Sequence, residues 1–276
     1  MTMKYGFSTI GCPEWLWKEV VSTAKDLGYD GIELRGLANK MYLPSTRTFS
    51  LENCREIRMQ LDTLGLTIPC LSTSAFIYDK SQQDAAQAEM RDYINLAQLL
   101  DTPFVRVMAD KEAAPGDAVD EGVILENLRE ISSLADDKDV MILIETNGAF
   151  ANTRRLAALM EKVDDPNVGV LWDIHHPFRF FGENPAETRK RIKDWLCYIH
   201  IKDSLIENGK VVYKMLGYGD VPLKEALGVL QDTGYEGFIV LEWMKRWVAD
   251  LEDPGVVFAH FPFAIKRLMR RTTRES

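Results

Sequence analysis

Short apolar segments alternate with longer amphipathic segments along the whole chain. The apolar segments have the near-continuous hydrophobic character of parallel strands that helices cover on both faces. The segments between them place apolar residues at helical spacing, as in residues 14–28 and 84–101. We therefore expect eight strands, at residues 5–10, 31–35, 67–72, 104–108, 140–145, 168–173, 197–202 and 238–242.

Eight strand–helix units predict a (β/α)8 TIM barrel, and the 276 residues are close to the roughly 250 typical of that fold. Several expected helices end at a glycine just before the next strand, as in DLGYDG and DTGYEG, which is typical of a helix C-cap. No linker or low-complexity tract interrupts residues 1–276, so we expect a single domain. Residues 204–219 depart from the pattern, because their Asn-Gly turn predicts a β-hairpin inserted after the seventh strand.

Composition narrows the functional class. With 46% hydrophobic and 27% charged residues the chain is ordinary for a globular protein, and its net charge of −9 argues against binding nucleic acid. No apolar run is long enough to span a membrane, and the N-terminus lacks the basic-then-apolar profile of a secretory signal. The four cysteines have no CxxC spacing, so we expect reduced thiols in a cytoplasmic protein.

Four consecutive expected strands each end in an acidic residue or a histidine. VMILIE ends at Glu145, VGVLWD at Asp173, CYIH at His200 and FIVLE at Glu242. Because parallel barrel strands direct their C-terminal ends to one face, these side chains should converge there. Three buried carboxylates would repel one another unless a cation lay among them. We therefore predict a site for one divalent metal ion, with the oxygen-rich ligand set favouring Mn²⁺ ahead of Mg²⁺, Co²⁺ or Zn²⁺.

Further polar residues on or beside these strands are candidates for substrate contacts. Strand alternation points Lys202 the same way as His200, where it could bind a carboxylate, a phosphate or a developing oxyanion. Arg106 interrupts an apolar strand, so we expect it to pair with a barrel carboxylate or to face the ligand. Two adjacent histidines follow the sixth strand, and we expect His176 to contact substrate, with His175 either beside it or in a supporting role.

Several segments resemble the sugar phosphate isomerase/epimerase family, the xylose isomerase-like barrels: LIETNG, LWDIHHP, YIHIKD, GYGDVP and GFIVLEW. The resemblance covers essentially the whole chain and implies one metal ion bound by Glu145, Asp173, His200 and Glu242. It also implies that Glu145 and Glu242 are the catalytic acid/base pair, moving a proton next to a ketone through a metal-stabilised enediolate. By the same resemblance Glu33 lies inside the barrel near the substrate, with a rim salt bridge to Arg35 as the alternative.

Two alternatives to an isomerase or epimerase stay open. The HIKD segment resembles the HxKD pattern of dehydratase-like relatives, which favours a lyase acting on a keto-polyol such as an inosose. The second alternative is a sugar-binding or partner subunit without activity of its own. The presence of all four ligand residues argues against it. Four histidines are too few for the three-zinc site of an endonuclease IV-like enzyme. We expect a small sugar or polyol-derived ketone as substrate. Because the sequence has no Gly-rich phosphate-binding motif, we expect this substrate to be unphosphorylated. Homo-oligomerisation stays open.

Overall fold

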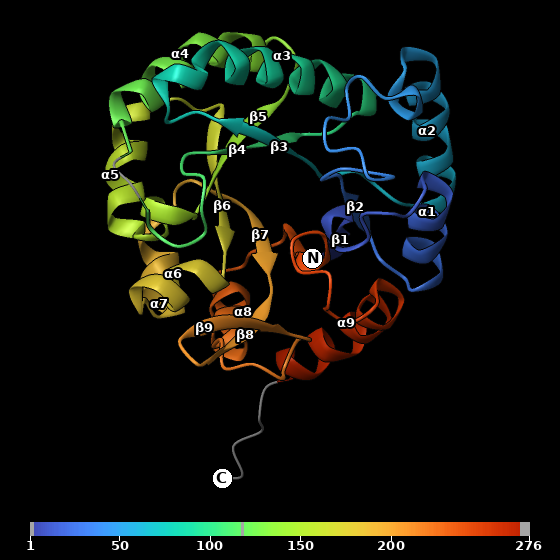
Figure 1. Cartoon of the computed structure of the whole chain (residues 1–276), viewed down its shortest axis with the longest axis vertical. Coiled ribbons are helices and arrows are strands. Elements are labelled where there is room, and N and C mark those ends of the chain that lie inside the picture. The colour runs from blue at the N-terminus through green and yellow to red at the C-terminus, as the bar shows by residue number, and fades with distance from the viewer. Residues whose placement is uncertain (1–2, 117–118, 271–276) are drawn as a thin grey trace.

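A barrel of parallel strands forms the centre of the molecule. The computed structural model describes residues 3–116 and 119–270. Within them eight parallel strands are ordered β2-β1-β10-β7-β6-β5-β4-β3, and helices surround them (Figure 1). Isolated parallel bridges from Gly31 to Thr67 and from Leu34 to Leu71 join the two ends of this order, which nearly closes the barrel. The prediction of a single-domain (β/α)8 barrel is confirmed.

The barrel strands are β1 (Lys4–Ser8), β2 (Gly31–Glu33), β3 (Cys70–Phe76), β4 (Phe104–Met108), β5 (Met141–Glu145), β6 (Val168–Asp173), β7 (Leu196–Ile201) and β10 (Phe238–Leu241). The helices are α1 (Trp17–Asp26), α2 (Leu51–Leu64), α3 (Gln83–Leu100), α4 (Glu121–Asp136), α5 (Thr153–Val163), α6 (His175–Phe181), α7 (Pro185–Arg191), α8 (Leu223–Asp232) and α9 (Pro254–Met269). In the described part of the chain, no helix combines the length and the apolar character that crossing a bilayer requires.

The third strand differs most from its expected bounds. It begins at Cys70 rather than at Thr67 and continues to Phe76. Pro69 has no N–H to donate to a ladder, so regular pairing starts only after it. The polar residues that follow still pair, because Ser72 lies opposite Arg106 on β4.

The hairpin that the Asn-Gly turn predicts is present. Strands β8 (Asp203–Glu207) and β9 (Lys210–Lys214) pair antiparallel directly after β7. Asn208 and Gly209 both have positive φ, 51° and 75°, as a tight two-residue hairpin turn requires. The hairpin therefore extends from the C-terminal end of β7, on the face where the four strand-end side chains meet.

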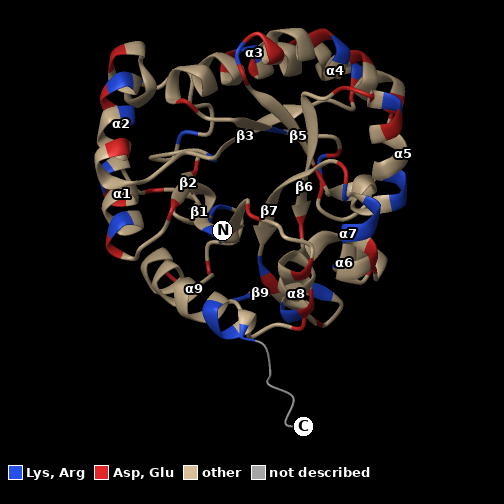
Figure 2. Cartoon of the chain, turned by 180° about the vertical axis from the view of Figure 1, so that it is seen from behind, with Lys and Arg blue, Asp and Glu red and all other residues tan. Residues whose placement is uncertain are grey.

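Local signals define where the surrounding helices begin and end. The Asp120 carboxylate accepts the N–H groups of Gly122 and Val123 at the start of α4, as a good N-cap does. Gly65 ends α2 in the left-handed conformation, which only glycine adopts without steric cost. Many of the charged residues lie on the surrounding helices (Figure 2), and the buried apolar residues of these helices cover the barrel.

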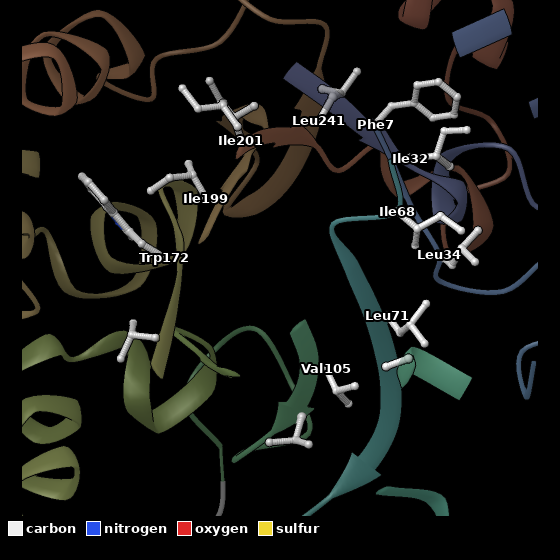
Figure 3. Packing of buried hydrophobic residues seen from close by; sticks show 14 of the residues in the cluster. Phe7, Ile32, Leu34, Ile68, Leu71, Val105, Trp172, Ile199, Ile201 and Leu241 are labelled. Carbon is white, nitrogen blue, oxygen red and sulfur yellow. The ribbon is translucent and has the colours of Figure 1, made fainter. Parts of the chain in front are cut away.

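Side chains on the barrel strands alternate between two cores. One set points outward and packs against the helices; Figure 3 shows members of it such as Phe7, Ile32, Val105, Trp172 and Leu241. The inward set forms a separate apolar cluster, here called the plug, of Cys70, Leu143, Leu171, Tyr198 and Val240. The plug fills the barrel interior and supports the polar residues that come next along each strand.

Candidate functional site

The four strand-end residues lie one alternation step beyond the plug. On four strands a plug residue is followed two positions later by a polar side chain on the same face. The pairs are Leu143 and Glu145, Leu171 and Asp173, Tyr198 and His200, and Val240 and Glu242. The change from apolar to polar on adjacent strands places a buried polar cluster directly above an apolar support.

The structure brings these four residues together as the sequence predicts. One ligand atom from each of Glu145, Asp173, His200 and Glu242 lies within 4.8 Å of the others, and all four residues are buried. The Nδ1 atom of His200 is 3.7 Å from a carboxylate oxygen of both Glu145 and Glu242. This buried nitrogen has no hydrogen-bond partner in the described residues, so it is available to a cation at the centre of the cluster.

Glu33 orients the imidazole of His200. His200 Nε2 donates to the Glu33 carboxylate at 2.6 Å, and the Ser72 hydroxyl donates to the same side chain at 3.1 Å. Metal-binding histidines commonly use their second nitrogen in this way, because the bond fixes the ring and its tautomer. Glu33 is fully buried and forms no ion pair with Arg35 in the described part of the chain, so the rim salt bridge is not observed.

Two buried cations neutralise part of the cluster. Arg106 Nε lies 3.2 Å from Glu145, and Lys202 Nζ contacts both Asp173 and Glu242. Burial alone would raise the pKa of the Glu145 carboxyl, but Arg106 and His200 reverse this and hold that pKa well below its usual range. Burial opposes ionisation of Glu242 too, and Lys202 together with His200 lowers its pKa. Both glutamates are therefore ionised at neutral pH.

The donor set fits a divalent ion. Burial would lower the pKa of His200, but the charges of Glu33 and Glu242 raise it well above the usual value. A proton then resides on the imidazole whenever no metal is bound, and a metal ion would replace that proton with a larger positive charge. Three carboxylates and one imidazole, already buried and converging, are ligands that hard or borderline divalent ions accept.

The adjacent histidines take different positions. His176 Nδ1 donates to the Thr146 carbonyl oxygen at 3.1 Å, which leaves its buried Nε2 without a partner among the described residues. His175 is instead directed to the hairpin, where its Nε2 meets the Ser204 hydroxyl at 2.9 Å. Burial lowers the pKa of both imidazoles, so both are neutral at neutral pH.

A cavity of about 560 Å³ opens onto the cluster. Among the residues that line it are Arg106, Glu145, His176, Lys202, Tyr213 and Glu242. Two members of the cluster, Asp173 and His200, are not among the lining residues. A ligand in the cavity would therefore meet the two glutamates, the lysine and His176, whose buried Nε2 has no partner among the described residues.

Residues that the sequence did not single out shape this cavity. Tyr213 comes from β9 of the hairpin. The buried carboxylate of Asp203 accepts backbone N–H groups from Ser204, Gly217, Gly219 and Val221, and so holds the chain that follows the hairpin against its base. The position of Asp203 directly after Lys202 is a sequence feature that could have marked it. Its backbone partners Gly217 and Gly219, however, lie beyond the hairpin and meet it only once the hairpin has folded.

Comparisons with known proteins agree with this architecture. Residues 21–258 match the sequence model of the xylose isomerase-like TIM barrel family. Fructoselysine 3-epimerase of Escherichia coli O157:H7 is 23% identical over 260 residues, which cover 89% of this chain and 92% of the relative. Inosose dehydratase of Clostridium botulinum (strain Eklund 17B / Type B) is 24% identical over 137 residues, 44% of this chain and 46% of the relative.

The fold has close counterparts among solved structures. D-psicose 3-epimerase of Clostridium cellulolyticum H10, solved with D-tagatose, superposes with a TM-score of 0.73 at 20% identity. The superposition covers 96% of this chain and 99% of that structure. Since the family match spans most of the sequence and the strand order is that of a TIM barrel, the chain belongs to the xylose isomerase-like TIM barrel family.

Proposed function

We propose that this protein is a divalent-metal-dependent isomerase or epimerase that acts on a sugar or a sugar-derived ketone. The observation that carries the proposal is the arrangement of the four-residue cluster. Its ligand atoms converge, and two of its carboxylates, Glu145 and Glu242, also line the cavity. The similarity to fructoselysine 3-epimerase over most of the chain supports the same class of reaction.

The metal ion would be held by Glu145, Asp173, His200 and Glu242, with Mn²⁺ as the favoured ion. A divalent ion in such a site supplies Lewis acidity that lowers the cost of negative charge on a substrate carbonyl oxygen. Glu33 supports this role because it fixes the ring of His200. The plug supports it as well, because a packed apolar layer keeps the ligand side chains in place.

Glu145 and Glu242 are the proposed acid/base pair. Glu145 ends β5 and Glu242 directly follows β10, and the sheet order places β6 and β7 between these strands. The two carboxylates therefore approach the cavity from separate sides. One can remove the proton from the carbon next to the ketone, and the other can pass a proton that it takes up from water to the opposite face, which inverts that carbon. Their lowered pKa values keep both ready to accept a proton at neutral pH.

Substrate contacts are assigned to the polar groups that line the cavity. His176 presents its unpartnered Nε2, which accepts a hydrogen bond from a sugar hydroxyl in the neutral tautomer. Lys202 and Arg106 place positive charge beside the oxygen that becomes negative during proton removal. His175 faces Ser204 and supports the start of α6, the helix that carries His176.

The test is proton exchange. The manganese-loaded protein is incubated with a panel of ketoses in deuterated water, and deuterium in the recovered sugar is measured by mass spectrometry. We expect incorporation at the carbon next to the ketone, with loss of activity of at least about 100-fold in Glu145→Gln and in Glu242→Gln. Glu161→Gln, an exposed substitution on α5, serves as the control and should match the wild type.

The same assay addresses the dehydratase alternative. Elimination would give a product that has lost water and absorbs in the ultraviolet, whereas epimerisation changes neither mass nor absorbance in ordinary water. The match to inosose dehydratase and the HIKD segment are what favour elimination as the second candidate. If the protein catalyses neither exchange nor elimination with any ketone of the panel, that result contradicts an enzymatic role.

A further inference from the structure

A second arginine, Arg35, lines the same cavity, and no assigned role uses it. It follows Glu33 by two positions, so alternation directs both side chains into the barrel. The backbone N–H of Arg35 donates to the Thr9 hydroxyl at 2.8 Å, and that hydroxyl donates to the Gly36 carbonyl oxygen at 2.6 Å. The base of the side chain is therefore fixed before any ligand arrives.

The guanidinium of Arg35 is held on one side and unpaired on the other. Its Nη2 donates to the Ser74 hydroxyl at 2.9 Å, whereas Nη1 is buried and has no hydrogen-bond partner in the described residues. Only 7% of Arg35 is exposed. An unpaired buried cation is costly, and a planar guanidinium with free N–H groups matches a carboxylate or a phosphate in both charge and shape.

Among the residues that the structure describes, no carboxylate forms an ion pair with the Arg35 guanidinium. Glu89 lies behind Ser74, but its carboxylate accepts the backbone N–H of Ser74 at 2.6 Å and forms no ion pair with Arg35 in the described part of the chain. Burial and the neighbouring charge of Arg106 lower the pKa of Arg35 to about 10, so the protein leaves this cation poorly compensated. Arg106 itself is already paired with Glu145.

A count of the charges inside the barrel also leaves the positive charge of Arg35 without a directly paired negative charge. Four carboxylates face the interior: Glu33, Glu145, Asp173 and Glu242. Arg106, Lys202 and a divalent ion together balance these four negative charges. Lys111 and Glu112, which also line the cavity, carry opposite charges and add no net charge to this count. Glu89 offsets the charge of Arg35 only from behind Ser74 and without an ion pair in the described residues, so Arg35 is the cavity cation that remains for a ligand. This count rests on the metal ion of the proposed function.

We infer that the substrate carries an anionic group, a carboxylate or a phosphate, and that Arg35 together with Ser74 binds this group at the side of the cavity formed by the loop after β2 and by β3. The reacting ketone would occupy the other side, next to Glu145 and Glu242. The substrate class then becomes an acidic keto-sugar rather than a neutral ketose.

A matched trio of probes tests this inference: D-fructose, its C6 acid D-fructuronate and D-fructose 6-phosphate. Their affinities for the manganese-loaded protein are measured by titration calorimetry. In the wild type we expect one of the two anions to bind about ten- to a hundredfold more tightly than fructose, as a charged hydrogen-bond pair would give. The anion that binds more tightly identifies the group as a carboxylate or a phosphate.

Two substitutions show whether Arg35 is responsible. Arg35→Met should remove the preference for the anion and leave the affinity for fructose within about twofold, while Lys111→Met should retain the preference. Unchanged thermal stabilisation of Arg35→Met by Mn²⁺ shows that this variant is folded. Equal affinities for all three probes, or loss of the preference in Lys111→Met but not in Arg35→Met, would overturn the inference. Deuterium exchange into fructose reports the proposed reaction separately, because it does not require Arg35.

Discussion

Replacement of Lys202 by methionine should destabilise the metal-free protein strongly and the metal-loaded protein much less. Lys202 is 1% exposed, and its ammonium group contacts the carboxylates of Asp173 and Glu242, which are themselves buried. The Lys202→Met variant keeps the apolar stem but leaves both carboxylates without this cation. A bound divalent ion would supply the missing positive charge.

The magnitude follows from the burial of the pair. Removing one partner of a buried ion pair costs about 3–5 kcal/mol, because the other partner is left as an uncompensated buried charge. For a chain of this size each 1 kcal/mol corresponds to about 2–4 °C, so the melting temperature in EDTA should fall by roughly 10 °C. Mn²⁺ at 100 times its dissociation constant should stabilise the wild type by about 2.7 kcal/mol and should stabilise Lys202→Met by more.

Thermal unfolding in EDTA and in excess MnCl₂ measures both quantities. Lys162→Met is the matched control, because Lys162 is an exposed lysine that pairs with Glu121 at the surface and should cost less than about 1 kcal/mol. The reasoning is refuted if Lys202→Met melts with the wild type in EDTA, or if Mn²⁺ stabilises the two proteins equally.

Three further predictions concern residues other than the metal ligands. Asp203→Asn should cost about 1–3 kcal/mol in urea unfolding, because the buried carboxylate accepts four backbone N–H groups; an unchanged midpoint would contradict this. Lys162 and Arg155 lower the pKa of Glu121, so its stabilising effect, below about 1 kcal/mol, is present above about pH 4.5 and is lost as the pH falls. Wild type and Glu121→Gln should then differ at pH 7 and converge near pH 3, and an equal difference at both would be inconsistent. Burial raises the pKa of all four free cysteines, so few of them are reactive thiolates at pH 8. An aromatic disulfide reagent should therefore label the folded protein slowly and label four thiols after denaturation. Rapid labelling of several thiols in the folded protein would contradict their burial.

The barrel and the convergence of the four strand ends could be predicted because both depend on short-range patterns. Each of the four strands is an apolar run bounded by loop residues, and the last of its side chains to face the barrel interior is polar. Glu145 and Asp173 are indeed the final residues of β5 and β6. His200 precedes the last residue of β7, and Glu242 follows β10 by one position, so alternation rather than strand length determines which way they face.

The remaining features depend on contacts between distant segments. The direction of His175 toward Ser204 requires the hairpin to be in place, and nothing near His175 in sequence indicates it. The third strand began later than expected because Pro69 interrupts an otherwise β-like run. Arg35 faces inward by alternation, but its unpaired nitrogen appears only when β2 and β3 lie side by side with Ser74 between Arg35 and Glu89.

Metal binding by the four-residue cluster is the central claim, and calorimetric titration of the chelator-treated protein with Mn²⁺ tests it most directly. Asp173→Asn is the informative variant, because Asp173 belongs to the cluster but does not line the cavity. The account predicts one ion bound per chain in the wild type and at least about tenfold weaker binding in Asp173→Asn. A wild type that binds no divalent ion, or a variant that binds Mn²⁺ as tightly as the wild type, would contradict it.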